Sequence, residues 1–406
     1  MTLTTTADPG IDSFSLAVMP DPYPAMRRLR ETAPVYWSAG EFAWLLTRRD
    51  DVLAALTDRR MAVVEIAPTL EKFAAASGRD FGALAACFDM ILFLRNPPRH
   101  AAERRFVARV LSGWPLSRLT PVVHQIASEL LAKGRRDGGM DLATGFADLL
   151  PPLLMARLFG MPDQDALTLT GLIGEISEVF DRGRSLRVYQ AMNERAVAAR
   201  ELLQAALEQR RRNPGDDMLS IMLALSDAEF RLSDADIIGQ AFFLFLAAIE
   251  TTSGLISGSL RALLQFPGEY AKLADGAIAP LKAFDELARF CGPILQTSRI
   301  ATEDLTIGGQ PVSAGQRVVL MLSAANRDPA AWADPETLIL GRPGPANLAF
   351  GLGGHQCLGL GLAKLETCVA VEKFIQLPGP RLVSADPVWR PLRTLRRLSS
   401  LPVVFN

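Results

Sequence analysis

Ten residues near the carboxyl end of the chain, from Phe350 to Gly359, bring together groups that can carry chemistry. They read FGLGGHQCLG, so three glycines precede Cys357, and a helical pattern follows it. Glycine lets the backbone pass close to another group. A thiolate just before a helix is stabilised by the free N–H groups and the dipole of the helix N-terminus. The loop therefore predicts a metal ligand or a nucleophile at Cys357.

The number of histidines and cysteines in the chain helps to decide between these roles of Cys357. A catalytic cysteine needs a positioned base, and zinc needs three or four suitable ligands. The chain has only three histidines and four cysteines, and no pair of cysteines has CxxC spacing. A single strong thiolate suits a haem iron better than either alternative.

The ten-residue loop resembles the cysteine-ligand loop of the cytochromes P450, Phe-Gly-x-Gly-x-His-x-Cys-x-Gly, and matches every fixed position. The resemblance extends over nearly the whole sequence and is closest to the soluble bacterial members. It implies a mainly α fold with small β-sheets, built as a single triangular-prism domain over residues 1–406 with a long central helix over haem. The further segments that carry it lie at 21–24, 47–52, 97–100, 286–289, 325–329 and 362–366.

By this resemblance the cofactor is haem b, and Cys357 is the axial thiolate of its iron. Haem carries two propionates, which cations must balance. His100 and Arg104 stand four residues apart on one predicted helix face, so both can reach the same propionate. The other cofactor contacts that the resemblance implies are Phe350, Arg299 and His355.

A long helix is predicted from about 233 to 266. Ser233 can cap it, Asp236 completes a capping box, and Pro267 is the next strong stop. Residues 241–249 are apolar on all faces, which indicates a segment surrounded by protein. Nine such residues are too few for a membrane span, which needs roughly 20.

Glu250 and Thr251 follow this apolar segment and resemble the acid–alcohol pair of the family. In that pair a distortion of the helix opens a pocket for O2, and the two side chains relay protons. The alternative is that Thr251 bonds back to a carbonyl four residues earlier and only bends the helix. Ala248 stands where the family usually has glycine, which adds a methyl group beside the expected oxygen groove.

The substrate pocket is expected above the haem, with mostly apolar walls that suit an apolar small molecule. Ordinary core packing is the alternative interpretation of the same residues. Arg182 and Arg184 lie in a segment that resembles the mobile lid of the family, where they would meet a polar or anionic group. The expected lining residues are Phe243, Leu246, Ala247, Leu295 and Thr297.

Several elements should support this site. A short strand at 42–46 is expected to lead into a capped helix, and residues 305–322 read as β structure with a turn at 308–309. A helix is expected from about 362 to 375. Asn96 is predicted to cap the helix that carries His100. Glu286 and Arg289 can pair across one helical turn, and the resemblance adds Arg342 as their partner.

Composition limits the class of protein. The chain has 43 basic and 44 acidic residues, so it has no positive surplus for holding phosphates, and nucleic-acid binding is not expected. With 49% hydrophobic and 21% charged residues it should form a large core. The first ten residues do not read as a secretory signal, and no membrane anchor is expected. These features predict a cytoplasmic globular protein.

The resemblance implies a haem-thiolate monooxygenase, an oxidoreductase that acts with O2 on paired donors. The sequence contains no flavin or iron-sulfur motif, so electrons are expected from an external ferredoxin with its NAD(P)H-dependent reductase. Arg105 and Arg109 could form part of the docking site, although a solvated helix face is the other interpretation. Oxidative coupling, desaturation, peroxide-driven oxidation and a non-catalytic haem sensor are the alternative functions.

Overall fold

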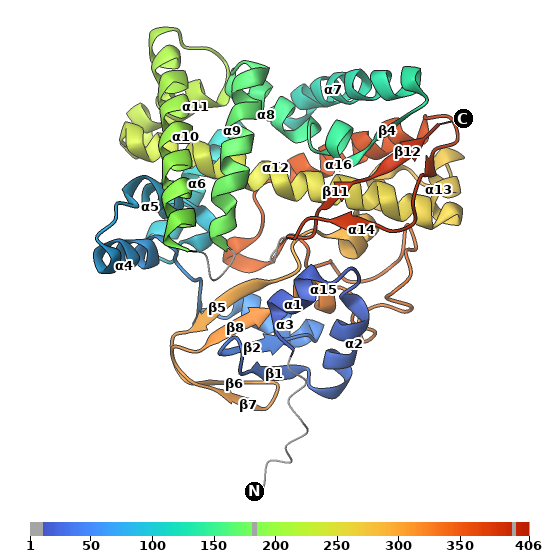
Figure 1. The fold of residues 1–406 in the computed structure, drawn as a ribbon, viewed down its shortest axis with the longest axis horizontal. Helices are drawn as coiled ribbons and strands as arrows, with labels where there is room; N and C mark the ends of the chain where they lie inside the picture. Colours follow the sequence, from blue (N-terminus) through green and yellow to red (C-terminus); the bar gives the residue numbers. More distant parts are fainter. Residues whose placement is uncertain (1–10, 181–184, 392–394, 406) are drawn as a thin grey trace, which may run out of the picture.

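A single helix, α12 (Asp234–Gln265), crosses the middle of the molecule and organises the fold (Figure 1). The computed structural model describes residues 11–180, 185–391 and 395–405. The Ser233 side chain accepts a hydrogen bond from Asp236 N, and the Asp236 carboxylate accepts from Ser233 N at 3.0 Å. This capping box and the end of the helix before Pro267 confirm the predicted central helix.

The length and apolar composition of α12 alone would allow it to cross a membrane. However, 72% of its most apolar window is buried inside the protein, so the structure makes it a core helix. The segment 241–249 is packed by the surrounding helices, as the sequence predicts. The longer helices around α12 are α5 (Gly82–Asp89), α8 (Leu150–Phe159), α9 (Asp163–Ile176), α10 (Leu186–Arg212), α14 (Pro280–Cys291) and α16 (Leu360–Ile375).

The remaining helices complete a mainly α molecule, in which the main sheet lies at the lower side of Figure 1 and the small sheets with β4 (Gly139–Asp141), β11 (Leu398–Ser400) and β12 (Pro402–Val404) lie at its upper right. Those above six residues are α2 (Tyr23–Thr32), α3 (Arg49–Thr57), α4 (Ala67–Ser77), α6 (Arg99–Ser112), α7 (Leu116–Asp137), α11 (Met218–Leu225) and α13 (Pro267–Ala274). The short ones are α1 (Ser13–Val18), α15 (Leu322–Ala325), η1 (Leu92–Leu94), η2 (Ala143–Ala147), η3 (Ser177–Phe180), η4 (Ser226–Phe230) and η5 (Gly353–His355).

The main sheet has five strands in the order β1-β2-β8-β5-β3, and it carries two of the predicted site residues on β5. Its strands are β1 (Val35–Ser38), β2 (Ala43–Leu46), β3 (Met61–Ala62), β5 (Thr297–Ala301) and β8 (Arg317–Leu320). Small sheets form from β4 (Gly139–Asp141), β6 (Leu305–Ile307), β7 (Gln310–Val312), β9 (Arg381–Leu382), β10 (Val388–Trp389), β11 (Leu398–Ser400) and β12 (Pro402–Val404).

The predicted β structure at 305–322 is confirmed as a hairpin and a following strand. Gly308 and Gly309 form the hairpin turn with φ of 54° and 81°, the left-handed region that glycine enters without strain. The strand predicted at 42–46 is β2, and the helix predicted from about 362 is α16, which begins two residues earlier.

Two predicted helix caps are wrong, because contacts with distant segments replace the local ones. Arg49 N at the start of α3 donates to Asp328 Oδ2 at 2.8 Å, and no neighbouring side chain caps this helix. Asn96 does not cap α6 either. Its side-chain amide instead accepts from Val63 N at 2.9 Å and donates to Val63 O at 3.0 Å, which fixes the backbone directly after β3.

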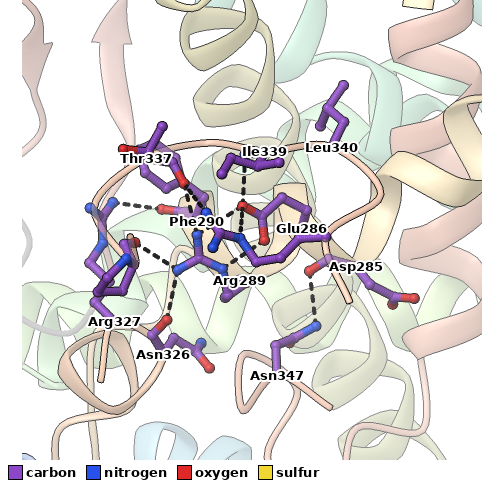
Figure 2. A network of polar contacts seen from close by, with 12 residues as sticks. Asp285, Glu286, Arg289, Phe290, Asn326, Arg327, Thr337, Ile339, Leu340 and Asn347 are labelled. Atoms are coloured by element: carbon purple, nitrogen blue, oxygen red, sulfur yellow. Dashed lines mark hydrogen bonds and ion pairs between the residues drawn. The ribbon is translucent and has the colours of Figure 1, made fainter. Parts of the chain in front are cut away.

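The predicted trio forms a buried network, in which Glu286 and Arg289 lie on α14 (Figure 2) and Arg342 comes from the later irregular segment. Arg289 Nε lies 2.7 Å from Glu286 Oε2, and Arg342 Nε lies 3.1 Å from Glu286 Oε1. Glu286 and Arg289 are only 5% and 3% exposed, so the pair is shielded from solvent, unlike a surface ion pair.

Candidate functional site

The Cys357 loop is closed by its own backbone. Cys357 N donates to Phe350 O at 3.0 Å, and the Phe350 ring stacks on Phe284 of α14 with centroids 5.7 Å apart. Gly351 and Gly353 have φ of 66° and 72°, and a side chain at Gly353 would begin 3.2 Å from a carbonyl of α3. The glycines in the motif are therefore required by backbone conformation and by close packing.

The Cys357 thiol has surroundings that suit a metal-bound thiolate. Burial raises its pKa, whereas hydrogen bonds from the backbone N–H groups of Gly359 and Leu360 and the charge of Arg104 lower it. Leu360 begins α16, so one of these N–H groups belongs to the first turn of the helix, as the sequence predicts. A cation bound to the sulfur would favour the thiolate further.

Three elements bring the predicted basic residues to this loop. His100 and Arg104 come from α6, Arg299 from β5 and His355 from η5. The rings of His100 and His355 lie 4.2 Å apart between centroids, and Arg104 Nη2 donates to Gln356 O at 2.8 Å. The structure therefore brings these side chains together around one loop, and their roles stay predictions.

None of these four basic residues forms an ion pair within the described part of the chain. Arg299 is 4% exposed and donates only to Thr297 Oγ1 at 3.2 Å and Ser298 O at 2.9 Å. His100 Nε2 and His355 Nδ1 are buried, and neither has a hydrogen-bond partner among the described residues.

The protonation of this group follows from its crowding. Burial lowers the pKa of Arg299 to about 10. Burial together with the nearby positive charges of His100, Arg299 and Arg104 lowers the pKa of His355 to about 3. A bound anion with several acceptor oxygens would raise the pKa values of Arg299 and His355 again, because it favours their charged forms. The two propionates of a haem held by Cys357 have this chemistry, so the residues present fit the group.

The structure places Glu250 and Thr251 in an unbroken part of α12. The Thr251 hydroxyl donates to Ala247 O at 2.6 Å, which is the back-bond weighed above as the alternative to a relay. Ala248 is partly exposed beside it. Burial raises the pKa of Glu250, and a hydrogen bond from Ser177 and the charge of Arg397 oppose that shift.

The predicted pocket residues divide into two groups. Phe243, Leu246 and Ala247 lie on α12 before Glu250, and the Phe243 ring is 6.1 Å from that of Phe93 between centroids. Leu295 lies between α14 and β5, and Thr297 is the first residue of β5. Leu295 has no exposed surface, and the Thr297 hydroxyl accepts from Arg299. Thr297 therefore lies beside Arg299, one of the residues predicted to bind the haem propionates.

The remaining predicted residues have mixed outcomes. Arg182 and Arg184 lie outside the described residues. Arg105 and Arg109 lie on α6, where Arg105 is exposed and Arg109 is 3.4 Å from Glu229. Sequence reasoning missed Arg397 and Asp148, which surround Glu250, because no local pattern connects the three positions.

The chain is similar to known proteins along its whole length. The family model described as Cytochrome P450 matches residues 282–377. The vitamin D(3) 25-hydroxylase of Pseudonocardia autotrophica is 32% identical, with 100% of this chain and 99% of that chain covered. The 6-deoxyerythronolide B hydroxylase of Saccharopolyspora erythraea is 33% identical, with 99% of each covered. The crystal structure of CalO2 matches with a TM-score of 0.88 and 27% identity, covering 98% of both chains.

Proposed function

Since the chain belongs to the cytochrome P450 family and is one of its monooxygenases, we propose that it inserts one oxygen atom from O2 into an apolar small molecule. Its fold is the one predicted from the sequence, mainly α with small sheets and a long central helix. The family binds haem through a cysteine thiolate. We propose haem b on Cys357, in one domain formed by residues 1–406.

The observation that carries this proposal is the group of basic side chains beside the Cys357 loop, which form no ion pair with the described residues. His100, Arg104, Arg299 and His355 would bind the propionates, and Phe350 would hold the loop against α14. When bound, the haem supplies the redox chemistry that activates O2, and its thiolate ligand favours cleavage of the O–O bond. The protein contributes the ligand, the orientation of the cofactor and a place from which water is excluded.

Apolar surfaces near α12 support an apolar substrate. Phe243, Phe93 and Phe180 form a run of aromatic contacts from α12 to η3, with centroids 6.1 and 6.2 Å apart. The relatives' names specify vitamin D(3) and 6-deoxyerythronolide B, which are both largely apolar. Oxidative coupling, desaturation and use of peroxide remain other reactions of the same site.

An optical titration of the purified ferric protein tests this function. Terpenes, fatty acids, steroids, macrolides and aromatic metabolites are added in turn while the Soret band of the haem is followed. A blue shift with one class, followed by a hydroxylated product from O2 and NAD(P)H, is the expected result. Turnover that yields only coupled or desaturated products would contradict the proposed oxygen insertion.

We propose that Glu250 and Thr251 handle protons at this site. Thr251→Ala removes the hydroxyl, so NAD(P)H oxidation should continue while product formed per NAD(P)H falls by about tenfold. The measurement is the ratio of product to NAD(P)H consumed, with hydrogen peroxide quantified in parallel. Thr251→Ser keeps the hydroxyl and should retain most of the coupling. Equal coupling in the alanine variant and the wild type would mean that the hydroxyl only bonds to Ala247 O.

We propose that a small acidic ferredoxin docks on the side of the molecule where the Cys357 loop meets α6 and α7. A cleft of about 290 Å³ lies there, and it is lined by Trp114, Leu116, Leu358 and Gly359 among others. Leu116 is 44% exposed, and Arg105 is exposed on the nearby α6. Gly359 N–H bonds to the Cys357 sulfur, so a partner in this cleft would approach the haem ligand closely.

The double variant Arg105→Glu and Arg109→Glu should raise the KM for an acidic ferredoxin by about tenfold, because it reverses charge on the docking face. The effect should weaken as ionic strength rises. The double variant Arg27→Glu and Arg28→Glu makes the same charge change at two exposed positions on α2 and should leave this KM unchanged. Equal KM values for both variants would place the docking site elsewhere.

The proposed cellular setting follows the sequence analysis. The relatives are bacterial P450 proteins, and we propose a cytoplasmic enzyme that receives electrons from NAD(P)H through a reductase and ferredoxin. The names of the relatives as hydroxylases favour turnover over the non-catalytic sensor considered above.

A further inference from the structure

Glu250 shares an arginine with a second carboxylate. Arg397 Nη1 lies 3.3 Å from Glu250 Oε1, while Arg397 Nη2 lies 2.7 Å from Asp148 Oδ1. Arg397 Nε also donates to Asp148 Oδ1 at 3.0 Å. The side chains of Arg397, Asp148 and Glu250 are 7%, 12% and 18% exposed, so water screens these contacts weakly.

A second arginine strengthens the hold on Asp148. Arg390 Nη2 lies 2.7 Å from Asp148 Oδ2, and Arg390 N donates to Arg397 O at 2.8 Å across the pairing of β10 with β11. Asp148 therefore has a short contact on each carboxylate oxygen. Glu250 accepts a hydrogen bond from Ser177, and its contact with Arg397 is longer, at 3.3 Å, and weaker than a charge-assisted bond of normal length.

The backbone that presents Arg397 is fixed from the other side. Arg396 N donates to Pro293 O at 2.7 Å, and Arg396 Nη1 donates to Met19 O at 3.1 Å. The Arg396 guanidinium also lies 3.7 Å from the centre of the Trp389 ring. β11 lies against α12 in the fold (Figure 1). The backbone that carries Arg397 is therefore fixed in its position next to α12.

We infer that Arg397 is a positioning residue for Glu250: its guanidinium holds the Glu250 carboxylate on the side of α12 that faces Asp148. Asp148 weakens this ion pair because it competes for the same guanidinium. The inference rests on the proposed proton-handling role of Glu250 and adds the element that regulates it. Arg397 lies closer to Asp148 than to Glu250, so Asp148 is the stronger competitor for this guanidinium.

Arg397 and Asp148 act on the pKa of Glu250 in opposite directions. Burial raises the pKa of Glu250, the charges of Arg397 and Arg390 and a hydrogen bond from Ser177 lower it, and the charge of Asp148 raises it. These are the charged and hydrogen-bonding groups that act on this carboxyl in the described chain. Loss of Arg397 should therefore favour the protonated carboxyl, whereas loss of the Asp148 charge should favour the carboxylate.

Two variants of the holoenzyme test this opposition. Arg397→Met keeps much of the side-chain length and removes the charge, and Asp148→Asn removes the competing charge with little change in shape. The apparent pKa of Glu250 is read from its carboxyl infrared band against pH, identified by its absence in Glu250→Gln. Arg397→Met should raise this pKa and Asp148→Asn should lower it, each by about one unit. The pH profile of product per NAD(P)H should move in the same directions.

Further variants separate the two ideas. Arg397→Lys keeps a cation and should return both readouts toward the wild type, whereas a purely structural role would leave this variant as impaired as Arg397→Met. Unchanged infrared titrations in both single variants, or shifts in the same direction, would overturn the inference. If Glu250→Gln retains full coupling, the proton-handling role of Glu250 fails instead, and the infrared result still decides whether Arg397 and Asp148 oppose each other.

Discussion

Cys357→Ser is expected to abolish the thiolate spectrum of the reduced carbon monoxide complex and to reduce monooxygenase activity by about 1000-fold or more, equivalent to roughly 4 kcal/mol. Serine is nearly the same size, so the loop should still close through the bond from this residue's N–H to Phe350 O. It cannot supply a thiolate, which is the electron-rich ligand that favours cleavage of the O–O bond. The spectrum and product formation are measured on the same preparation.

A second cysteine provides the matched control. Cys368 is on α16, the helix that follows the Cys357 loop, and burial raises the pKa of its thiol to about 11. Cys368→Ser should leave the thiolate spectrum intact, since this sulfur is a protonated packing group. A thiolate spectrum that persists in Cys357→Ser would contradict the assignment of Cys357 as the haem ligand. Loss of that spectrum in Cys368→Ser would mean that Cys368 is the ligand instead.

Features coded by neighbouring residues could be predicted from the sequence. The capping box of α12 depends on Ser233 and Asp236, three positions apart, and the pair of Glu286 and Arg289 depends on one helical turn. The Cys357 loop is similarly local, because the spacing of its glycines fixes the backbone that closes it. Such features need no knowledge of the tertiary fold.

Contacts between distant segments could not be predicted in the same way. The cap of α3 is Asp328, and the partner of Glu250 is Arg397, which directly precedes β11 and is 147 positions away in the sequence. The resemblance to a family supplied Arg299 and Arg342, since a family carries long-range pairings with it. It supplied no counterpart for Arg397, so the network with Asp148 emerged only from the three-dimensional arrangement.

Glu286→Gln is expected to reduce the free energy of unfolding by about 3–5 kcal/mol. Glu286 Oε1 accepts from Ile339 N at 3.0 Å and from Arg289 Nη2 at 2.8 Å, and Oε2 accepts from Arg289 Nε. A glutamine has one acceptor oxygen, so its amide N–H groups would face the donors of Arg289 and Arg342. Two buried guanidinium groups would then lack their carboxylate. Denaturant unfolding followed by circular dichroism measures the loss.

The same substitution should also weaken the cofactor loop, because the network continues towards it (Figure 2). Arg289 Nη1 donates to Asn326 O at 2.9 Å, and Asn326 Oδ1 accepts from Leu348 N at 2.7 Å, two residues before Phe350. Haem should therefore be lost at a lower denaturant concentration in Glu286→Gln than in the wild type. Arg157→Gln breaks a half-exposed pair with Asp163 and should cost about 1 kcal/mol or less. Equal losses in the two variants would mean that burial gives the Glu286 network no special weight in stability.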